Sequence, residues 1–440
     1  MNDQAQRAQR TTIARFLLGA CIAAGVACSS GGGGDSQPAD TGPTRAFMMG
    51  ATPFFATPTT FPDWRFDHLA DKDLLSVHAD DFWGVPWIQF RDNAALPQPW
   101  VDKWTAFANS ARATGKARYL ALSPLTDRIT LASDVQADGS TRTRWAPTDA
   151  NGCYLFATDA AAAGYKDAYI KYVTYLIGLV QPSYVSPAIE VNIQFTACPA
   201  QKAAWIAWYA DVHNAIKAAF PDLVVFPTFQ LEHLYGLDPP AICAAGVSRN
   251  DCFDARLAEA LTMPGDRIAF SSYPIGWKYH ADFNFSFPRD TYARVQAATT
   301  RKIWIAETGY AAVRIFASYP HAGVGSCGTE LFPPTYANDT EQAAYLSWLL
   351  AEAQTRNMES VIWWLERDYL DGTVAARCPC DPATSDTCIM TDTFFNVGGA
   401  NGELLMRFFG NMALRNYDNS PRPAHTIWRS YLERRLRPAS

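Results

Sequence analysis

Short runs of apolar residues alternate with longer segments of helical periodicity from Arg45 to the end of the chain. The pattern predicts eight strands, over residues 46–51, 73–79, 117–122, 186–195, 223–229, 267–273, 302–307 and 360–365. Between and after them, the apolar spacing predicts helices over 160–180, 201–220, 341–354 and 422–436. Residues 338–340 offer an N-cap for the third of these helices. Strands that alternate with helices are typical of parallel βαβ units.

Eight such units predict one domain of the α/β class over residues 45–440, a (β/α)8 TIM barrel. An open doubly wound sheet would alternate in the same way, but the Gly-rich phosphate turn after its first strand is missing. Long irregular segments follow predicted strands at 129–156, 235–256, 274–286, 311–337 and 366–400. We therefore expect long βα loops at the C-terminal face of the barrel, where barrel enzymes build their sites.

Residues 1–27 have the pattern of an export signal. Three arginines precede an apolar run over 16–26, which is too short to span a bilayer. The signal resembles that of a bacterial lipoprotein, in which a cysteine becomes the lipidated first residue. Cys28 is preferred over Cys21 because it leaves a longer apolar region and is followed by a Gly/Ser-rich tether, residues 28–44. We expect an exported protein, lipid-anchored to the outer membrane or cell surface; a cleaved, secreted product is the alternative.

Eight cysteines follow Cys28, and an even number in an exported chain predicts disulfides. They fall almost wholly in the irregular segments, so disulfides are expected to staple the βα loops together. A bridge between Cys243 and Cys252 would close a short loop, whereas the remaining connectivity stays open. The pair Cys378 and Cys380 has a spacing seen in zinc sites, but no histidine lies nearby.

Composition narrows the class of partner. With 48% hydrophobic and 18% charged residues the chain can bury a large core, which excludes global disorder. A net charge of −6 without a basic block argues against a nucleic-acid partner. The aromatic fraction of 13% suits a core, an interface or a sugar-stacking cleft. No HExxH motif or close histidine pair is present, so we expect no metal. We also expect a monomer that has no cofactor.

Two carboxylates end predicted strands that lie across the barrel mouth from each other. The fourth strand carries Glu190, Asn192 and Gln194 on one face, and the seventh ends in Glu307. Glycoside hydrolysis needs such a pair, one acid to protonate the leaving oxygen and one carboxylate to attack or to activate water. The alternative is that each glutamate is a salt-bridged strand end. A serine hydrolase is not indicated, because no GxSxG motif is present.

Four stretches resemble the clan A glycoside hydrolases, most closely the endo-β-1,4-galactanase (arabinogalactan galactosidase) family and its relatives. The run AIEVN at 188–192 is similar to the motif that carries the acid/base, and IAETGY at 305–310 to the nucleophile motif. DRIAFSSYP at 266–274 resembles a run whose tyrosine, here Tyr273, contacts the nucleophile. Trp363-Trp364 resembles the tryptophan that floors the subsite of the sugar being cleaved.

The resemblance implies a retaining enzyme that cleaves a glycosidic bond, expected to be β, in a polysaccharide or oligosaccharide by double displacement. Glu190 would be the acid/base and Glu307 the nucleophile, and a hydrogen bond from Tyr273 would favour the charged form of Glu307. A carbohydrate is therefore the expected partner. Trp83 is expected to stack on sugar, as are Trp87, Trp277 and Tyr279, with core packing as the alternative for each.

The chain departs from the family at two positions. Ile189 stands where the clan has an asparagine before the acid/base, and the usual arginine of the second strand is replaced by the run of His78, Asp80 and Asp81. Asn192 or Gln230 is expected to supply the missing amide. If neither does, the alternative is a catalytically inactive barrel that binds polysaccharide at the cell surface.

Overall fold

The computed structural model describes residues 43–52, 69, 71–80, 83–126, 128–142, 147–158, 164–237, 243–279, 286–313, 315–317, 329–332, 337–368 and 409–437. The described residues, all of which lie in Pro43–Ser440, form one compact unit. The export signal with Cys21 and Cys28, and the tether up to Gly42, therefore lie outside the described residues. None of the described helices is long and apolar enough to cross a membrane.

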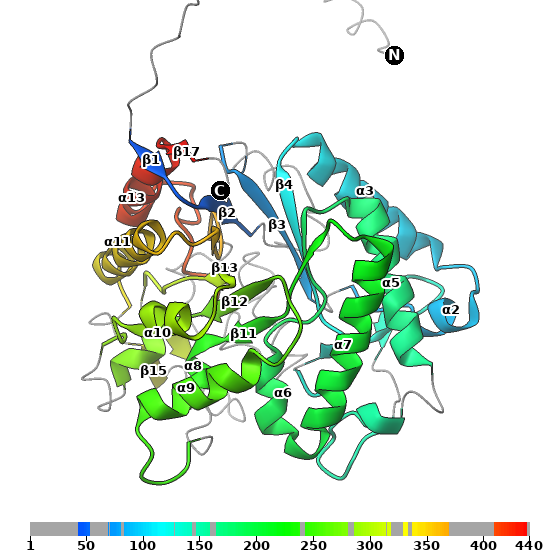
Figure 1. The fold of residues 1–440 in the computed structure, drawn as a ribbon. Coiled ribbons are helices and arrows are strands. Elements are labelled where there is room, and N and C mark those ends of the chain that lie inside the picture. Colours follow the sequence, from blue (N-terminus) through cyan, green and yellow to red (C-terminus); the bar gives the residue numbers. More distant parts are fainter. Residues whose placement is uncertain are drawn as a thin grey trace, which may run out of the picture. The chain divides into compact units, whose positions relative to one another are not determined.

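The centre of the compact unit is a sheet of nine strands, all paired in parallel (Figure 1). Their order is β10-β9-β4-β3-β2-β16-β13-β12-β11. The strands are β2 (Met48–Ala51), β3 (Leu74–Asp80), β4 (Ala117–Leu122), β9 (Tyr184–Ser186), β10 (Val224–Val225), β11 (Thr228–Gln230), β12 (Arg267–Ser272), β13 (Lys302–Thr308) and β16 (Ser360–Trp363). Each of the eight predicted strands is represented, so the predicted TIM barrel is confirmed.

The two outer strands of this sheet are consecutive in the chain. The sequence predicts one strand over 223–229, but the structure divides it into β10, which pairs with β9, and β11, which pairs with β12. Only Phe226 and Pro227 separate the two pieces, and Pro227 has no N–H with which to continue a ladder. The chain itself therefore connects the two outer strands, and this connection closes the sheet into a barrel.

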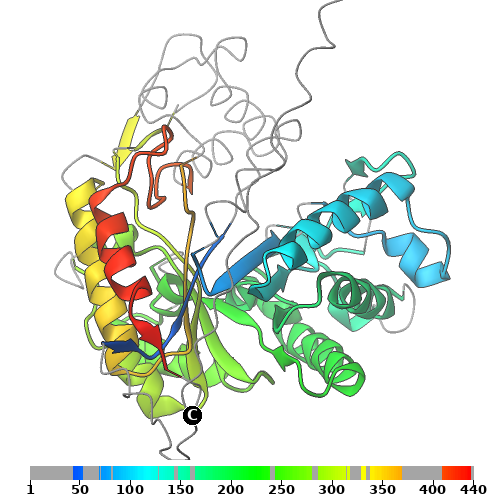
Figure 2. The same ribbon diagram turned by 90° about the horizontal axis from the view of Figure 1, so that it is seen from above.

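Helices follow the strands and cover the sheet (Figures 1 and 2). Those described are α2 (Trp87–Asp92), α3 (Gln98–Ala113), α5 (Tyr165–Val180), α6 (Val191–Ala197), α7 (Lys202–Ala219), α8 (Leu231–Leu234), α9 (Arg249–Ala260), α10 (Thr291–Ala298), α11 (Asp339–Thr355) and α13 (Pro423–Leu432). α5 packs against α7, and α11 against α13. The four predicted helices are confirmed: α5, α7 and α13 are shorter than predicted, and α11 is longer at both ends. Asn338 caps α11 by accepting the N–H of Glu341 at 2.9 Å.

One predicted strand is wrong over most of its length. The sequence predicts a strand over 186–195, whereas β9 ends at Ser186 and α6 begins at Val191. The segment 189–195 has apolar residues at every second position, but its buried Val191 and Phe195 are also four residues apart, which suits one face of a helix. Pro187 cannot donate to a ladder, so the strand stops before the helical spacing takes over.

Aromatic side chains fill the interior of the barrel. Tyr119 of β4 and Trp304 of β13 lie 5.7 Å apart by ring centroid, although several strands separate them in the sheet. Phe226 contacts both rings. Contact between strands that are not neighbours requires the side chains to meet inside the barrel, so this cluster forms a solid floor beneath the strand ends.

The described residues include two disulfides. Cys153 is bonded to Cys198, directly after α6, and Cys243 is bonded to Cys252 in α9. The second bridge is the one that the sequence predicts. The first bridge fastens the loop around 147–158 to the helix that follows β9. Cys327, Cys378, Cys380 and Cys388 lie outside the described residues.

Candidate active site

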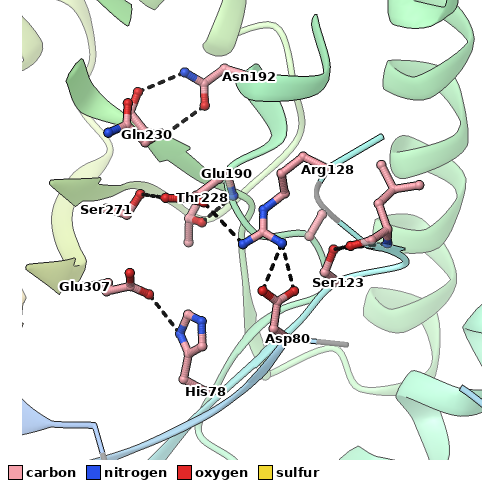
Figure 3. Close-up of polar contacts among 12 residues, drawn as sticks. His78, Asp80, Ser123, Arg128, Glu190, Asn192, Thr228, Gln230, Ser271 and Glu307 are labelled. Carbon is pink, nitrogen blue, oxygen red and sulfur yellow. Dashed lines mark hydrogen bonds and ion pairs between the residues drawn. The ribbon is translucent and has the colours of Figure 1, made fainter. Parts of the chain in front are cut away.

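Glu190 follows β9 and stands at the start of α6. Its φ of 49° is in the left-handed region, which costs a non-glycine residue of order 1 kcal/mol or more. The backbone is held there because its N–H donates to Oγ1 of Thr228, at the beginning of β11, at 2.9 Å. This conformation turns the chain from strand into helix and aims the Glu190 side chain into the barrel mouth (Figure 3).

Glu307 lies near the carboxyl end of β13, with 7% of its surface exposed. The hydroxyl of Tyr273, which directly follows β12, donates to its Oε1. Nδ1 of His78 in β3 lies 3.1 Å from its Oε2 (Figure 3). The predicted contact between Tyr273 and Glu307 is thus present, and His78 is brought to the other oxygen of the same carboxyl group.

Burial has the largest effect on the pKa of Glu307. Loss of solvation, followed by the charge of Glu190, raises its pKa to about 8, while the Tyr273 hydrogen bond and the Arg128 charge act in the opposite direction. The Tyr273 hydrogen bond favours the charged form of Glu307, as predicted, but desolvation outweighs it. Burial also lowers the pKa of His78 to about 4, so this histidine is neutral near pH 7.

The carboxylate of Glu190 meets a different donor at each oxygen. Oγ of Ser271 in β12 donates to Oε1 at 2.6 Å, and Nη2 of Arg128 donates to Oε2 at 3.2 Å. Nη1 of Arg128 also donates to both oxygens of Asp80, at the end of β3, at 2.9 Å each (Figure 3). Sequence reasoning missed Arg128. The available signal was that it is the first cation after the predicted strand 117–122.

The two amides expected to replace the missing asparagine are occupied elsewhere. Asn192 donates to the carbonyl of Gln230 at 2.9 Å and accepts the N–H of that residue at 2.8 Å. The side chain of Gln230 donates to Glu232 and accepts from the backbone of His233. The Asn192 amide joins α6 to β11, and the Gln230 side chain caps α8, so neither supplies the expected amide beside Glu190. Ile189 is 3% exposed and packs inside the barrel.

The tryptophans divide between site and core. Trp364 follows β16 and contacts His78 edge-on, with ring centroids 5.1 Å apart, which brings it beside Glu307. Trp363 is fully buried and donates its indole N–H to the carbonyl of Met412. Its predicted role in the floor of the site is wrong, because successive strand residues point to opposite faces of a sheet. Trp83 is packed edge-on against Trp104, which favours its alternative role in core packing.

Two further aromatic candidates are core residues. The indole of Trp87 donates to the carbonyl of Ala132, and that of Trp277 donates to Glu232; both rings are fully buried. The side chain of Tyr279 lies outside the description. Glu232 is itself buried between Trp277, Gln230 and Ser272, and burial raises its pKa. In the described part of the chain, no three His, Cys, Asp or Glu side chains gather as metal ligands would.

Similarity to known proteins is confined to three-dimensional structure. No protein-family model matches the chain, and no curated protein matches its sequence. A GH5_18 protein from Bifidobacterium longum subsp. infantis superposes with a TM-score of 0.52 at 14% identity, covering 90% of this chain and 81% of its own. GH5_18 from Streptomyces cattleya, in complex with GlcNAc, gives 0.50 at 14% identity, covering 90% and 83%.

A third structure, the GH53 catalytic domain of Ignisphaera aggregans, gives a TM-score of 0.48 at 17% identity, with 88% of this chain and 96% of that chain covered. These proteins are clan A glycoside hydrolases. The chain has their barrel fold. At the open end of this fold, two carboxyl groups from β13 and the start of α6 face each other with separate sets of donors, an arrangement suited to acid–base and nucleophilic chemistry.

Proposed function

We propose that the protein is a retaining glycoside hydrolase that cleaves a β-glycosidic bond in a polysaccharide or oligosaccharide. The observation that carries the proposal is the pair of Glu190 and Glu307, which interact electrostatically at the mouth of a glycoside hydrolase barrel. The sequence resemblance to the galactanase family around both residues supports a β-linked substrate. The Streptomyces cattleya structure, solved with GlcNAc, supports a carbohydrate ligand.

In the first step the carboxylate of Glu307 attacks the anomeric carbon while Glu190 gives its proton to the departing oxygen. The C–O electron pair stays with that oxygen, and a glycosyl ester forms on Glu307. In the second step Glu190 takes a proton from water, which attacks the same carbon and releases Glu307. One proton shared by the two glutamates serves this cycle, provided that it is on Glu190 when the bond breaks. Tyr273 and His78 orient the nucleophile.

The second candidate function is binding without catalysis. It is favoured by Ile189, which is packed into the barrel, and by the amides of Asn192 and Gln230, which bond to backbone and to Glu232. No side chain described here supplies the amide that the clan uses beside the acid/base. A catalytically inactive barrel would then retain polysaccharide at the cell surface.

A screen of aryl β-glycosides and of plant and bacterial polysaccharides separates the two functions. On a substrate found in this way, Glu307→Gln should abolish turnover, because no covalent intermediate can form. Glu190→Gln should reduce kcat/KM for poor leaving groups by a factor on the order of 10²–10⁴ and spare kcat/KM for activated aryl glycosides, whose bond cleavage needs no proton. Glu433→Gln, an exposed carboxylate on the C-terminal side of α13, is the matched control. Saturable polysaccharide binding without any product would favour the binder.

We also propose that the mature protein begins at a lipidated Cys28, on the strength of the signal and tether in the sequence. Mass spectrometry of the protein isolated from membranes should find a diacylglyceryl group on that cysteine. An unmodified N-terminus at a later residue would instead identify a secreted product.

A further inference from the structure

The two oxygens of Glu190 are not equivalent as carriers of a proton. Oε2 faces the guanidinium of Arg128 and Oε1 faces the hydroxyl of Ser271. A guanidinium has five N–H donors and no acceptor, whereas a hydroxyl both donates and accepts. An O–H group at Oε2 would therefore point a hydrogen at the donors of Arg128, while an O–H group at Oε1 can be accepted by Ser271.

Arg128 is itself fixed in position. Its Nη1 bonds both oxygens of Asp80, so the guanidinium spans from Asp80 to Glu190 (Figure 3). The side chains of Arg128 and Glu190 are only 13% and 15% exposed, which limits screening of these charges by water. Asp80 ends β3 and Glu190 follows β9, whereas Arg128 lies in the loop after β4, so the network joins three separate segments of the chain.

Three residues of this cluster share the same strained backbone conformation. Asp80, Arg128 and Glu190 have φ values of 46°, 61° and 49°. Left-handed φ is uncommon outside glycine, and such residues gather at functional sites, where the surrounding structure enforces them. That all three partners of one ion-pair network share this conformation indicates that the network is a built feature and not an incidental surface contact.

We propose that Arg128, held by Asp80, is a positioning residue that confines the transferable proton of Glu190 to Oε1. The proposal rests on the assignment of Glu190 as acid/base. When the glycosidic bond breaks, the Oε1–H bond breaks with it and the proton moves to the leaving oxygen, which keeps the C–O electron pair. Ser271 then turns its hydroxyl from acceptor to donor, which is the contact seen here. Oε2 stays an acceptor of Arg128 throughout.

The test is a series of aryl and alkyl glycosides of one sugar, graded by the pKa of the leaving alcohol. In Arg128→Gln we expect kcat/KM for the poorest leaving groups to fall on the order of 10²-fold, within the range of general acid catalysis. For dinitrophenyl glycosides the fall should stay within about threefold, since these need no proton. Arg128→Lys keeps a charge and a donor and should recover part of the loss.

Two further variants identify how Arg128 acts. Asp80→Asn should show the same leaving-group dependence in a weaker form. The double variant Asp80→Asn, Arg128→Gln should have the same kcat/KM values as Arg128→Gln alone, because Asp80 acts through Arg128. Arg294→Gln is the matched control, because Arg294 bonds two aspartates on the helical surface and contacts none of the site residues. It should behave as the wild type.

If Arg128→Gln lowers kcat/KM equally for all substrates of the series, or for none, the inference is overturned. A purely structural role would lower kcat/KM for all substrates alike. If Arg128→Gln fails to fold, the same criterion applies to Arg128→Lys and Asp80→Asn. Failure of the proposed function has a different signature, since Glu190→Gln would then also lack the leaving-group dependence. If Glu190→Gln shows it and the Arg128 variants do not, only the positioning role is wrong.

Discussion

Glu307 is the residue at which burial and hydrogen bonding act against each other. Desolvation and the charge of Glu190 raise its pKa to about 8, in spite of the donor on Tyr273 and the charge of Arg128. Because of this shift, Glu307 holds a proton near neutral pH. For the reaction proposed here, that proton must pass to Glu190 before the nucleophile can attack.

The pH dependence of kcat/KM should therefore reflect the raised pKa of Glu307. With poor leaving groups we expect kcat/KM to fall above about pH 8, where Glu307 loses the proton that the reaction must pass to Glu190. With dinitrophenyl glycosides only the ionised nucleophile is needed, so activity rises through the pKa of Glu307. In Glu190→Gln this rise should move to lower pH by about one unit or more, because the repelling charge is gone. A rise that stays in place or moves upward would contradict the coupling.

At the residue scale, the sequence predicted side chains that lie at strand ends and missed those that depend on the path of a loop. Glu307, Tyr273 and His78 belong to strands or directly follow them, so their position could be read from the pattern. Arg128 reaches Glu190 only because the chain after β5 (Leu125–Thr126) turns through a left-handed residue. Local patterns carry no information on such a turn.

At the scale of elements, the order of strands and helices was predicted, but two predicted strands are not continuous. The segments 186–195 and 223–229 were both expected to be continuous strands, and both contain a proline that ends a ladder. The first error had a consequence for the site. On a strand, Asn192 would share a face with Glu190, whereas in α6 it turns away to bond the backbone of Gln230.

The two disulfides should differ in their contribution to stability. Cys153 and Cys198 are 45 residues apart, and Cys243 and Cys252 are 9 apart. Loop entropy then gives about 4 kcal/mol for the first bridge and about 2.5 kcal/mol for the second. We expect the Cys153→Ser, Cys198→Ser variant to lose more free energy of unfolding in urea than the Cys243→Ser, Cys252→Ser variant, which serves as its control. Equal losses, or the reverse order, would contradict this prediction.

At the scale of the whole molecule, closure of the barrel is what brings the two glutamates together. Glu190 and Glu307 are more than a hundred residues apart in the chain, and their strands, β9 and β13, are not neighbours in the sheet. The alternation of strands and helices predicted this closure, since eight units return the last strand to the first. The aromatic floor of Tyr119, Phe226 and Trp304 supports both strand ends from below.

The most direct test of the central claim is to trap the covalent intermediate. A 2-deoxy-2-fluoro glycoside of the sugar found in the screen, with an activated leaving group, slows release of the glycosyl-enzyme more than its formation. Peptide mass spectrometry of the digested protein should then find one glycosyl ester, on Glu307, and none in Glu307→Gln. A label on another residue, or steady turnover to a product of inverted configuration without any label, would contradict a double displacement by Glu190 and Glu307.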